Sequence, residues 1–250
     1  VYGDNFAFCT STEKGNAYAE ECMKNLFTLA PDLAGFINIS VGESISCCAS
    51  IGNNEITCPH CKAVGLTRGQ LLSNCEEALR RGMNSIKPDA ELISWAYAHR
   101  SWNMDDIKEY CSIRSDDIIL MQNFEDWGEE EQLGKTRLAI DYWLSYTGPG
   151  AIFRESVKIA NERETPMYAK LQVCCSHEVA TVPYVPVPGI LYKKYKYLHE
   201  KRVTGVIQCW YFGNYPSLMS KTAGELSFEP FFEDEQSFMK HVAGIYWGGK

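Results

Sequence analysis

The sequence lacks any uninterrupted apolar run close to the roughly 20 residues that a membrane-spanning helix requires. At its start it also lacks a basic segment followed by an apolar one, the pattern of a secretory signal peptide. Basic stripes are missing too, and the net charge of −8 would repel a phosphate backbone. These absences predict a protein with no membrane segment and no nucleic-acid partner, whose ligand is neutral or cationic.

Cysteine, in contrast, is abundant. The 250 residues contain 11 cysteines, an odd number that cannot all pair within one molecule. Five of them stand alone in the sequence, namely Cys9, Cys22, Cys75, Cys111 and Cys209. Isolated free cysteines usually behave as small buried apolar residues. We therefore expect a reducing, cytoplasmic compartment. The chain starts with Val1 rather than Met, from which we expect a processed protein or a fragment of a longer one.

Apolar segments with the length of strands alternate with amphipathic segments of helical spacing, the pattern of consecutive βα units around a parallel sheet. In the helix predicted from Thr67, for example, Thr67 and Gln70 can form a capping box, and Leu71, Cys75 and Met83 share one apolar stripe. The predicted strands are 5–9, 34–40, 91–97, 117–122, 139–145, 167–174 and 205–210. The predicted helices are 16–30, 67–86, 104–111, 151–161, a segment ending at 199, and 233–246.

This rhythm predicts a parallel (β/α)8 barrel of the TIM type, formed by residues 1–250 as a single domain. Seven strands are one short of a closed barrel, so the barrel would be incomplete at its N-terminus, with the first strand or two before Val1. The rival is an open doubly wound sheet, but its glycine-rich turn between strand and helix is absent. The acidic stretch 125–132 is predicted to be a surface loop, and 44–66 a cysteine-rich βα loop.

Polar and aromatic residues follow the predicted strands, where the βα loops of such barrels build the active site. Two carboxylates could divide acid, base and nucleophile duties in glycoside hydrolysis, and the candidates are Glu43 and Glu178. Aromatic rings can stack on pyranose rings, and polar side chains can bind hydroxyls. The candidate sugar-binding residues are Trp95, Tyr97, His99, Asn123, Glu125, His177, Gln208, Trp210 and Asn214.

Each candidate also has a structural alternative. The aromatic residues could be core fillers, and Glu43 could cap a backbone amide in a loop. Glu125 stands beside a run of acids, so it could belong to a solvated loop, and His177 could be a satisfied structural histidine.

The cysteines of the 44–66 loop have the spacing of a metal site. Cys58 and Cys61 form a C-x2-C pair like that of a zinc knuckle, and Cys47 or Cys48 could supply a third thiolate. The fourth ligand could be the other cysteine of that pair, His60, or a distant residue such as Cys9. A disulfide and free thiols are the alternatives. Structural zinc that fastens the loop, with no organic cofactor, is the prediction.

Several segments resemble glycoside hydrolases. Residues 31–43, followed by the cysteine-rich loop, look like the central strand of hexosaminidase-like and α-glucuronidase-like (β/α)8 barrels; residues 169–172, 176–178 and 205–217 strengthen the likeness. The resemblance implies that Glu43 is the general acid. Gly42 replaces the first member of the Asp-Glu pair of hexosaminidases, which argues against substrate-assisted hydrolysis of an N-acetyl sugar.

The sequence therefore favours a glycoside hydrolase with a carbohydrate substrate, with Glu43 as acid/base and Glu178 as nucleophile or second carboxylate. If 34–40 is the fourth barrel strand and 139–145 an insertion, Glu178 follows the seventh strand, where many retaining glycosidases of this fold carry their nucleophile. The alternatives are a non-catalytic carbohydrate-binding barrel and a zinc-stabilised interaction domain.

Overall fold

The computed structural model describes residues 9–42, 47–50, 56, 58–97, 102–139, 142–174, 176, 178, 185–208 and 216–248. The chain forms two compact units. The first consists of Val1–Gln122 with Lys158–Met167, and the second of Asn123–Val157 with Tyr168–Lys250. The chain therefore enters the second unit after the third parallel strand, returns to the first within a helix, and leaves it again at the next strand.

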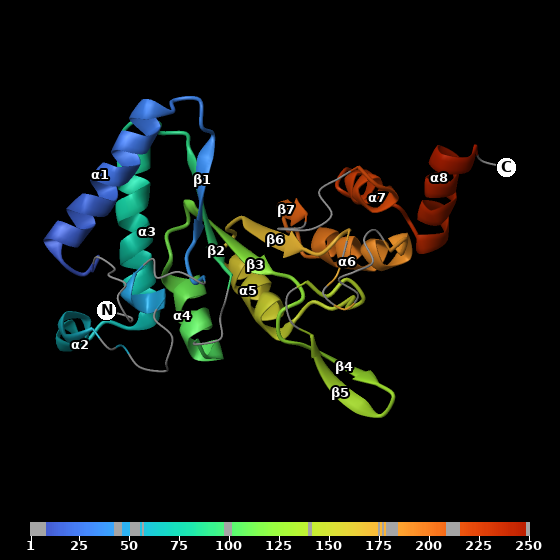
Figure 1. Ribbon diagram of the computed structural model, residues 1–250, viewed down its shortest axis with the longest axis horizontal. Helices are drawn as coiled ribbons and strands as arrows, with labels where there is room; N and C mark the ends of the chain where they lie inside the picture. Colours follow the sequence, from blue (N-terminus) through green and yellow to red (C-terminus); the bar gives the residue numbers. More distant parts are fainter. Residues whose placement is uncertain are drawn as a thin grey trace. The chain divides into compact units, whose positions relative to one another are not determined.

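Five parallel strands form one sheet in the order β1-β2-β3-β6-β7 (Figure 1). The strands are β1 Gly35–Ile39, β2 Glu91–Ala96, β3 Ile118–Asn123, β6 Met167–Leu171 and β7 Gly205–Gln208. In the register, Phe36 pairs with Leu92, and Leu92 pairs with Ile118. The order in the sheet follows the order in the chain, whereas a doubly wound sheet reverses direction at a switch point.

The prediction of an eight-stranded barrel is wrong, because the parallel sheet of the described residues has five strands. Five of the seven predicted strands occur. Of the predicted strand 5–9, residues 5–8 lie outside the described residues. The segment 139–145 is the second exception, because Ala139 ends a strand of a separate antiparallel sheet.

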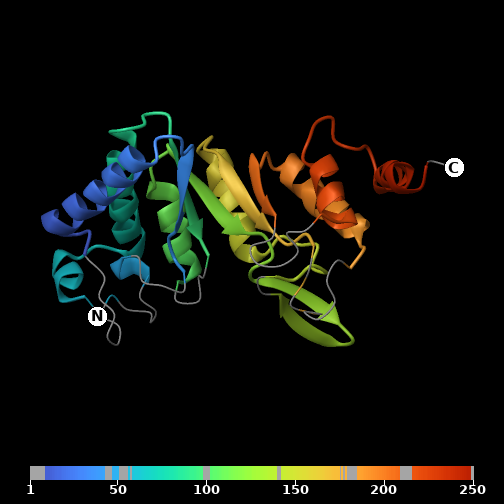
Figure 2. The same cartoon turned by 45° about the horizontal axis from the view of Figure 1, so that its top comes forward.

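In the first unit, helices cover one face of β1 and β2, as Figure 2 shows for α1, α3 and α4. The core between them contains Met23 and Phe27 of α1, Met83 of α3, Leu92 and Ile118. The apolar spacing in α1 and α3 turns these side chains to the sheet, and burying each stabilises the fold by roughly 1.5–3 kcal/mol. The helical elements of this unit are α1 Glu13–Leu29, η1 Cys48–Ser50, α2 Pro59–Val64, α3 Arg68–Asn84 and α4 Met104–Ile113.

The start of α3 confirms the predicted capping box. The Gln70 backbone N–H donates to the Thr67 hydroxyl at 3.2 Å, and the Gln70 side chain accepts from the Thr67 N–H at 3.1 Å. The two bonds satisfy donors that the first turn of a helix would otherwise leave unpaired.

The second unit contains a β-hairpin that neither the strand nor the loop predictions included. Strands β4 Gly128–Gln132 and β5 Lys135–Ala139 pair antiparallel, with Glu130 opposite Arg137. Leu133 and Gly134 both have positive φ, of 53° and 72°, as a two-residue turn of type I′ requires. The acidic stretch 125–132 is therefore partly a strand, because its carboxylates face a partner strand that carries basic residues. The hairpin extends away from the helices of its own unit (Figures 1 and 2).

Helices complete the second unit, and α6 packs on both α7 and α8. Their bounds are α6 Pro188–Glu200, α7 Leu218–Leu226 and α8 Glu235–Trp247, and α5 Ala151–Glu162 runs from this unit into the first. Among the described residues, no helix combines the length and the apolar character needed to cross a bilayer.

Candidate functional site

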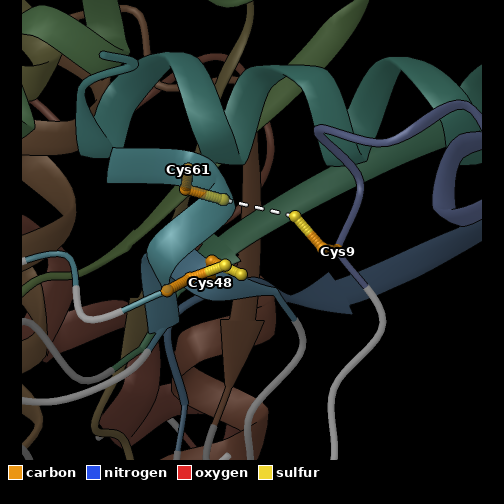
Figure 3. A group of neighbouring side chains, drawn as sticks. Cys9, Cys48 and Cys61 are labelled. Atoms are coloured by element: carbon orange, nitrogen blue, oxygen red, sulfur yellow. Dashed lines mark hydrogen bonds between the residues drawn. The ribbon is translucent and has the colours of Figure 1, made fainter. Parts of the chain in front are cut away.

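Four cysteines of the first unit gather at one point. Their Sγ atoms all lie within 4.8 Å of one another, and the four are Cys9, Cys48, Cys58 and Cys61. Figure 3 shows Cys9 beside Cys61, at an Sγ–Sγ distance of 3.2 Å, with Cys48 close to both. That distance is too long for a disulfide bond, which measures about 2.05 Å. Thiolates bound tetrahedrally to zinc at about 2.3 Å would stand roughly 3.8 Å apart, so the cluster could hold a metal ion such as zinc.

Helix α2 explains how two of these thiols meet. Cys58 is the residue before the helix, Pro59 occupies the first turn, and Cys61 follows three positions later on the same side. Gly65 ends the helix in the left-handed region, at φ 74°. Ser11 ties the Cys9 segment to α2, because its hydroxyl lies 3.4 Å from the Cys61 Sγ.

The surroundings of the thiols differ. Burial raises the pKa of Cys61 to about 11, and burial also raises the pKa of Cys48. Burial acts in the same direction on Cys58, but hydrogen bonds from the backbone and thiol of Cys61 outweigh it, so the pKa of Cys58 is lowered. A bound dication would displace the thiol protons, because a coordinating thiol is deprotonated outright.

The cluster differs from the predicted set at one position. Cys9 occupies the fourth place, and Cys47 lies outside the group. The Cys47 thiol is buried, 3.8 Å from the Ser50 hydroxyl. A hydrogen bond with Cys47, together with burial, raises the pKa of Cys75. Adjacent residues project in different directions, which explains why Cys48 joins the cluster and its neighbour does not.

Hydrogen bonds hold the end of β1, just before Glu43. The Ser40 hydroxyl donates to Glu76 at 2.9 Å, and the Ser50 hydroxyl donates to the Ser40 carbonyl at 2.9 Å. The Tyr110 hydroxyl lies 2.5 Å from the other Glu76 oxygen. Burial raises the pKa of Glu76, although its hydrogen-bond donors oppose this shift. These bonds fix Ser40 and Ser50 within the first unit.

Glu178 lies in the second unit, just beyond β6, and its exposed carboxylate is held by the backbone N–H of Ser145 at 3.0 Å and by the Ser145 hydroxyl. The Ser176 hydroxyl lies 2.6 Å away from the carboxylate. Burial raises the pKa of Glu178, but the bonds from Ser145 and Ser176 outweigh it, so the pKa is lowered. A carboxylate in this setting stays ionised and fixed at neutral pH.

Behind Glu178 lies a buried ion pair. Lys194 Nζ is 2.7 Å from Glu125 Oε1, and both side chains are fully buried. The same ammonium lies 3.3 Å from the carbonyl oxygens of Trp143 and Gln172. Lys194 therefore joins the segments that carry Ser145 and Glu178. For Glu125, the predicted alternative of a solvated loop residue is wrong.

A second buried lysine lies in the same unit. Lys170, on β6, is fully buried, and its Nζ lies 3.7 Å above the ring of Tyr142. This cation–π contact stabilises the positive charge of Lys170, which the buried strand keeps away from water.

The other predicted site residues have structural partners. Trp95 is fully buried, with its ring 5.1 Å from that of Tyr97, as expected of a core filler. Asn123 is also buried, and its amide donates to Asp126 at 3.1 Å. The Gln208 amide donates to the Tyr195 hydroxyl at 2.9 Å. The predicted residues outside the described part of the chain are Glu43, His99, His177, Trp210 and Asn214.

Sequence reasoning missed the residues that support Glu178. Ser145, Ser176 and Lys194 fall in or beside segments predicted for other reasons, and a serine or lysine has no pattern that marks such a role. Lys170 offered one signal, because a lysine inside an apolar strand needs a buried partner.

The chain was compared with protein-family models, with curated proteins and with solved structures, and none of the three comparisons gave a match. The resemblance to hexosaminidase-like and α-glucuronidase-like hydrolases stays a prediction, as do the compartment and the substrate.

Proposed function

We propose that this chain is a glycoside hydrolase in which Glu178 is the nucleophile or second carboxylate and Glu43 the general acid/base. The setting of Glu178 is the observation that carries the proposal. Its carboxylate is exposed, accepts bonds from Ser145 and Ser176, and has a lowered pKa. A nucleophile needs this combination of access, fixed orientation and negative charge.

Both proposed residues follow strands of the parallel sheet. Glu43 comes after β1 in the sequence, and Glu178 comes after β6. In parallel α/β sheets, ligands bind beyond the carboxyl ends of the strands.

Buried charges give the Glu178 site rigid support. Lys194 bonds to Glu125 and to the carbonyls of Trp143 and Gln172. The segment that carries Ser145 and the segment that carries Glu178 are therefore held by the same buried lysine. Catalytic groups need such support, because small misplacements cost much of the rate.

Hydrolysis of a panel of aryl glycosides tests the proposal. Glu178→Gln and Glu43→Gln should each abolish most of the activity, whereas Glu21→Gln, an exposed carboxylate on α1, should leave it unchanged. Glycan binding without turnover by the wild type would instead favour a non-catalytic carbohydrate-binding protein. Full activity of Glu178→Gln would contradict the role of Glu178.

We also propose that the four-cysteine cluster holds zinc in a structural role. Four thiolates whose sulfur atoms lie within 4.8 Å of one another are a soft donor set. A site with four protein ligands has no open position for substrate. Cys48 stands five residues after Glu43, so a metal bound there would fasten the segment that carries the proposed acid/base.

Elemental analysis tests this assignment. The purified protein should contain about one zinc ion per chain. Cys61→Ser should lose the metal, and Cys22→Ser, an exposed cysteine outside the cluster, should keep it. Metal-free wild-type protein with normal stability would favour the free-thiol or disulfide alternative.

A further inference from the structure

Trp127 has a backbone conformation that its side chain disfavours. Its φ is 59°, and it is the third residue of a turn in which the Gly128 N–H donates to the Glu125 carbonyl at 3.2 Å. Turns with positive φ at this position usually carry glycine or asparagine. A bulky residue there is strained, and such strain tends to persist at functional sites.

Neighbouring backbone holds this turn from the other side. The Gly150 N–H donates to the Phe124 carbonyl at 2.8 Å, and the Ala151 N–H donates to the Trp127 carbonyl at 3.1 Å. A Cβ at Gly150 would lie only 1.6 Å from the Asp126 carbonyl oxygen, so the two segments touch backbone to backbone. The contact fixes Trp127 in place.

Despite this fixed position, Trp127 is 47% exposed. A tryptophan that helped to stabilise the core would be buried, and a surface position of positive φ would be more stable with glycine. The exposed ring is a rigid, flat apolar face, the kind of surface that stacks on the C–H face of a pyranose ring.

Packing connects the Trp127 turn to Glu178. Gly128 lies against the ring of Tyr146, because a Cβ there would fall 2.3 Å from a ring atom. Tyr146 follows Ser145, whose N–H holds the Glu178 carboxylate at 3.0 Å. Trp127 and the proposed nucleophile therefore belong to one packed region of the second unit.

The charge around Trp127 favours particular sugars. Residues 126–139 contain four acidic side chains and two basic ones, a net charge of −2. An anionic polysaccharide would be repelled at this surface, whereas a neutral or cationic one would not.

From these observations we propose that Trp127 is the stacking platform of an additional subsite beside Glu178, which binds a pyranose ring of a neutral or cationic oligosaccharide. The inference rests on the proposed function, because it assumes that the glycan reaches Glu178. Glycine at this position should relieve the strain and remove the platform, so it separates a binding role from a structural one.

Calorimetric titration with four hexasaccharides tests the platform: cellohexaose, chitohexaose, a glucosamine hexamer and hexagalacturonate. For the hexamer that the wild type binds best, Trp127→Gly should raise Kd roughly tenfold or more, the size of effect expected for an interface aromatic. Trp127→Phe should lose less binding affinity than Trp127→Gly. Both variants should have a thermal midpoint that equals or exceeds the wild-type value. Trp247→Ala, which removes a 73% exposed tryptophan on α8, should bind as the wild type does.

Several results would overturn the platform. These are unchanged binding by Trp127→Gly, a clear fall in its thermal midpoint, preference for hexagalacturonate, or no binding of any hexamer by the wild type. Parallel aryl glycoside assays of Glu178→Gln separate this failure from that of the proposed function. If Glu178→Gln is inactive and Trp127→Gly binds normally, the platform alone is wrong. If Glu178→Gln is fully active and Trp127→Gly binds weakly, the platform stands and the role of Glu178 fails.

Discussion

Replacing Lys194 by methionine should destabilise the protein by about 3–5 kcal/mol, the cost of removing one partner of a buried ion pair. The Lys194 ammonium lies 2.7 Å from Glu125 Oε1, and neither side chain is exposed. Methionine fills a similar volume, so the loss comes mainly from the Glu125 carboxylate, which keeps the Gln172 N–H at 3.0 Å as a donor but has no counter-ion.

A double variant isolates this electrostatic cost. In Lys194→Met/Glu125→Gln no charge of the pair is buried, and the glutamine oxygen can still accept from the Gln172 N–H. We expect the second substitution to recover at least about 2 kcal/mol of the loss, because neutral replacement of a buried pair is often well tolerated.

Urea unfolding followed by circular dichroism measures both free energies of unfolding. A loss below about 1 kcal/mol, or a double variant no more stable than the single one, would refute the view that this pair anchors the Glu178 site.

Three further predictions concern the first unit. Burial raises the pKa of Glu76 in the folded protein. The free energy of unfolding of the wild type should therefore fall as the pH rises from about 4.3, the pKa in the unfolded chain, through the pKa in the folded protein. In urea unfolding at several pH values across this range, Glu76→Gln should show a weaker dependence of stability on pH. Thr67→Ala removes the capping box of α3 and should lower the free energy of unfolding by about 1 kcal/mol, measured by chemical denaturation against Thr28→Ala on α1. Cys61→Ser should have a lower thermal midpoint than the wild type with zinc bound. A chelator should lower the thermal midpoint of the wild type but not that of the variant.

The parallel strands could be predicted because each is a short apolar segment between helices of regular spacing. The hairpin could not, because Glu129, Glu130 and Glu131 resemble a solvated loop until Arg137 and its neighbours are known to lie opposite. The sequence pattern also could not show whether the sheet closes into a barrel. The alternation of strands and helices gives the order of the strands but not the number of strands that pair in one sheet.

The candidate site was predictable where spacing is short. Cys58 and Cys61 meet because one helical turn brings them together, but the choice of Cys9 over Cys47 depends on how a distant segment packs against α2. Trp95 was assigned to sugar binding from its place on a strand, yet that face is filled with other side chains and buries it. The surroundings of Glu178 depend on Ser145, 33 residues away in sequence.

Chemical rescue of Glu178→Ala tests the central claim most directly. The small side chain leaves room for formate or azide to replace the missing carboxylate, and hydrolysis of an activated aryl glycoside can be followed with and without the added anion. If Glu178 is the nucleophile, the variant should be nearly inactive and should recover activity as the anion concentration rises. Wild-type hydrolysis rates in Glu178→Ala without any added anion would contradict the assignment.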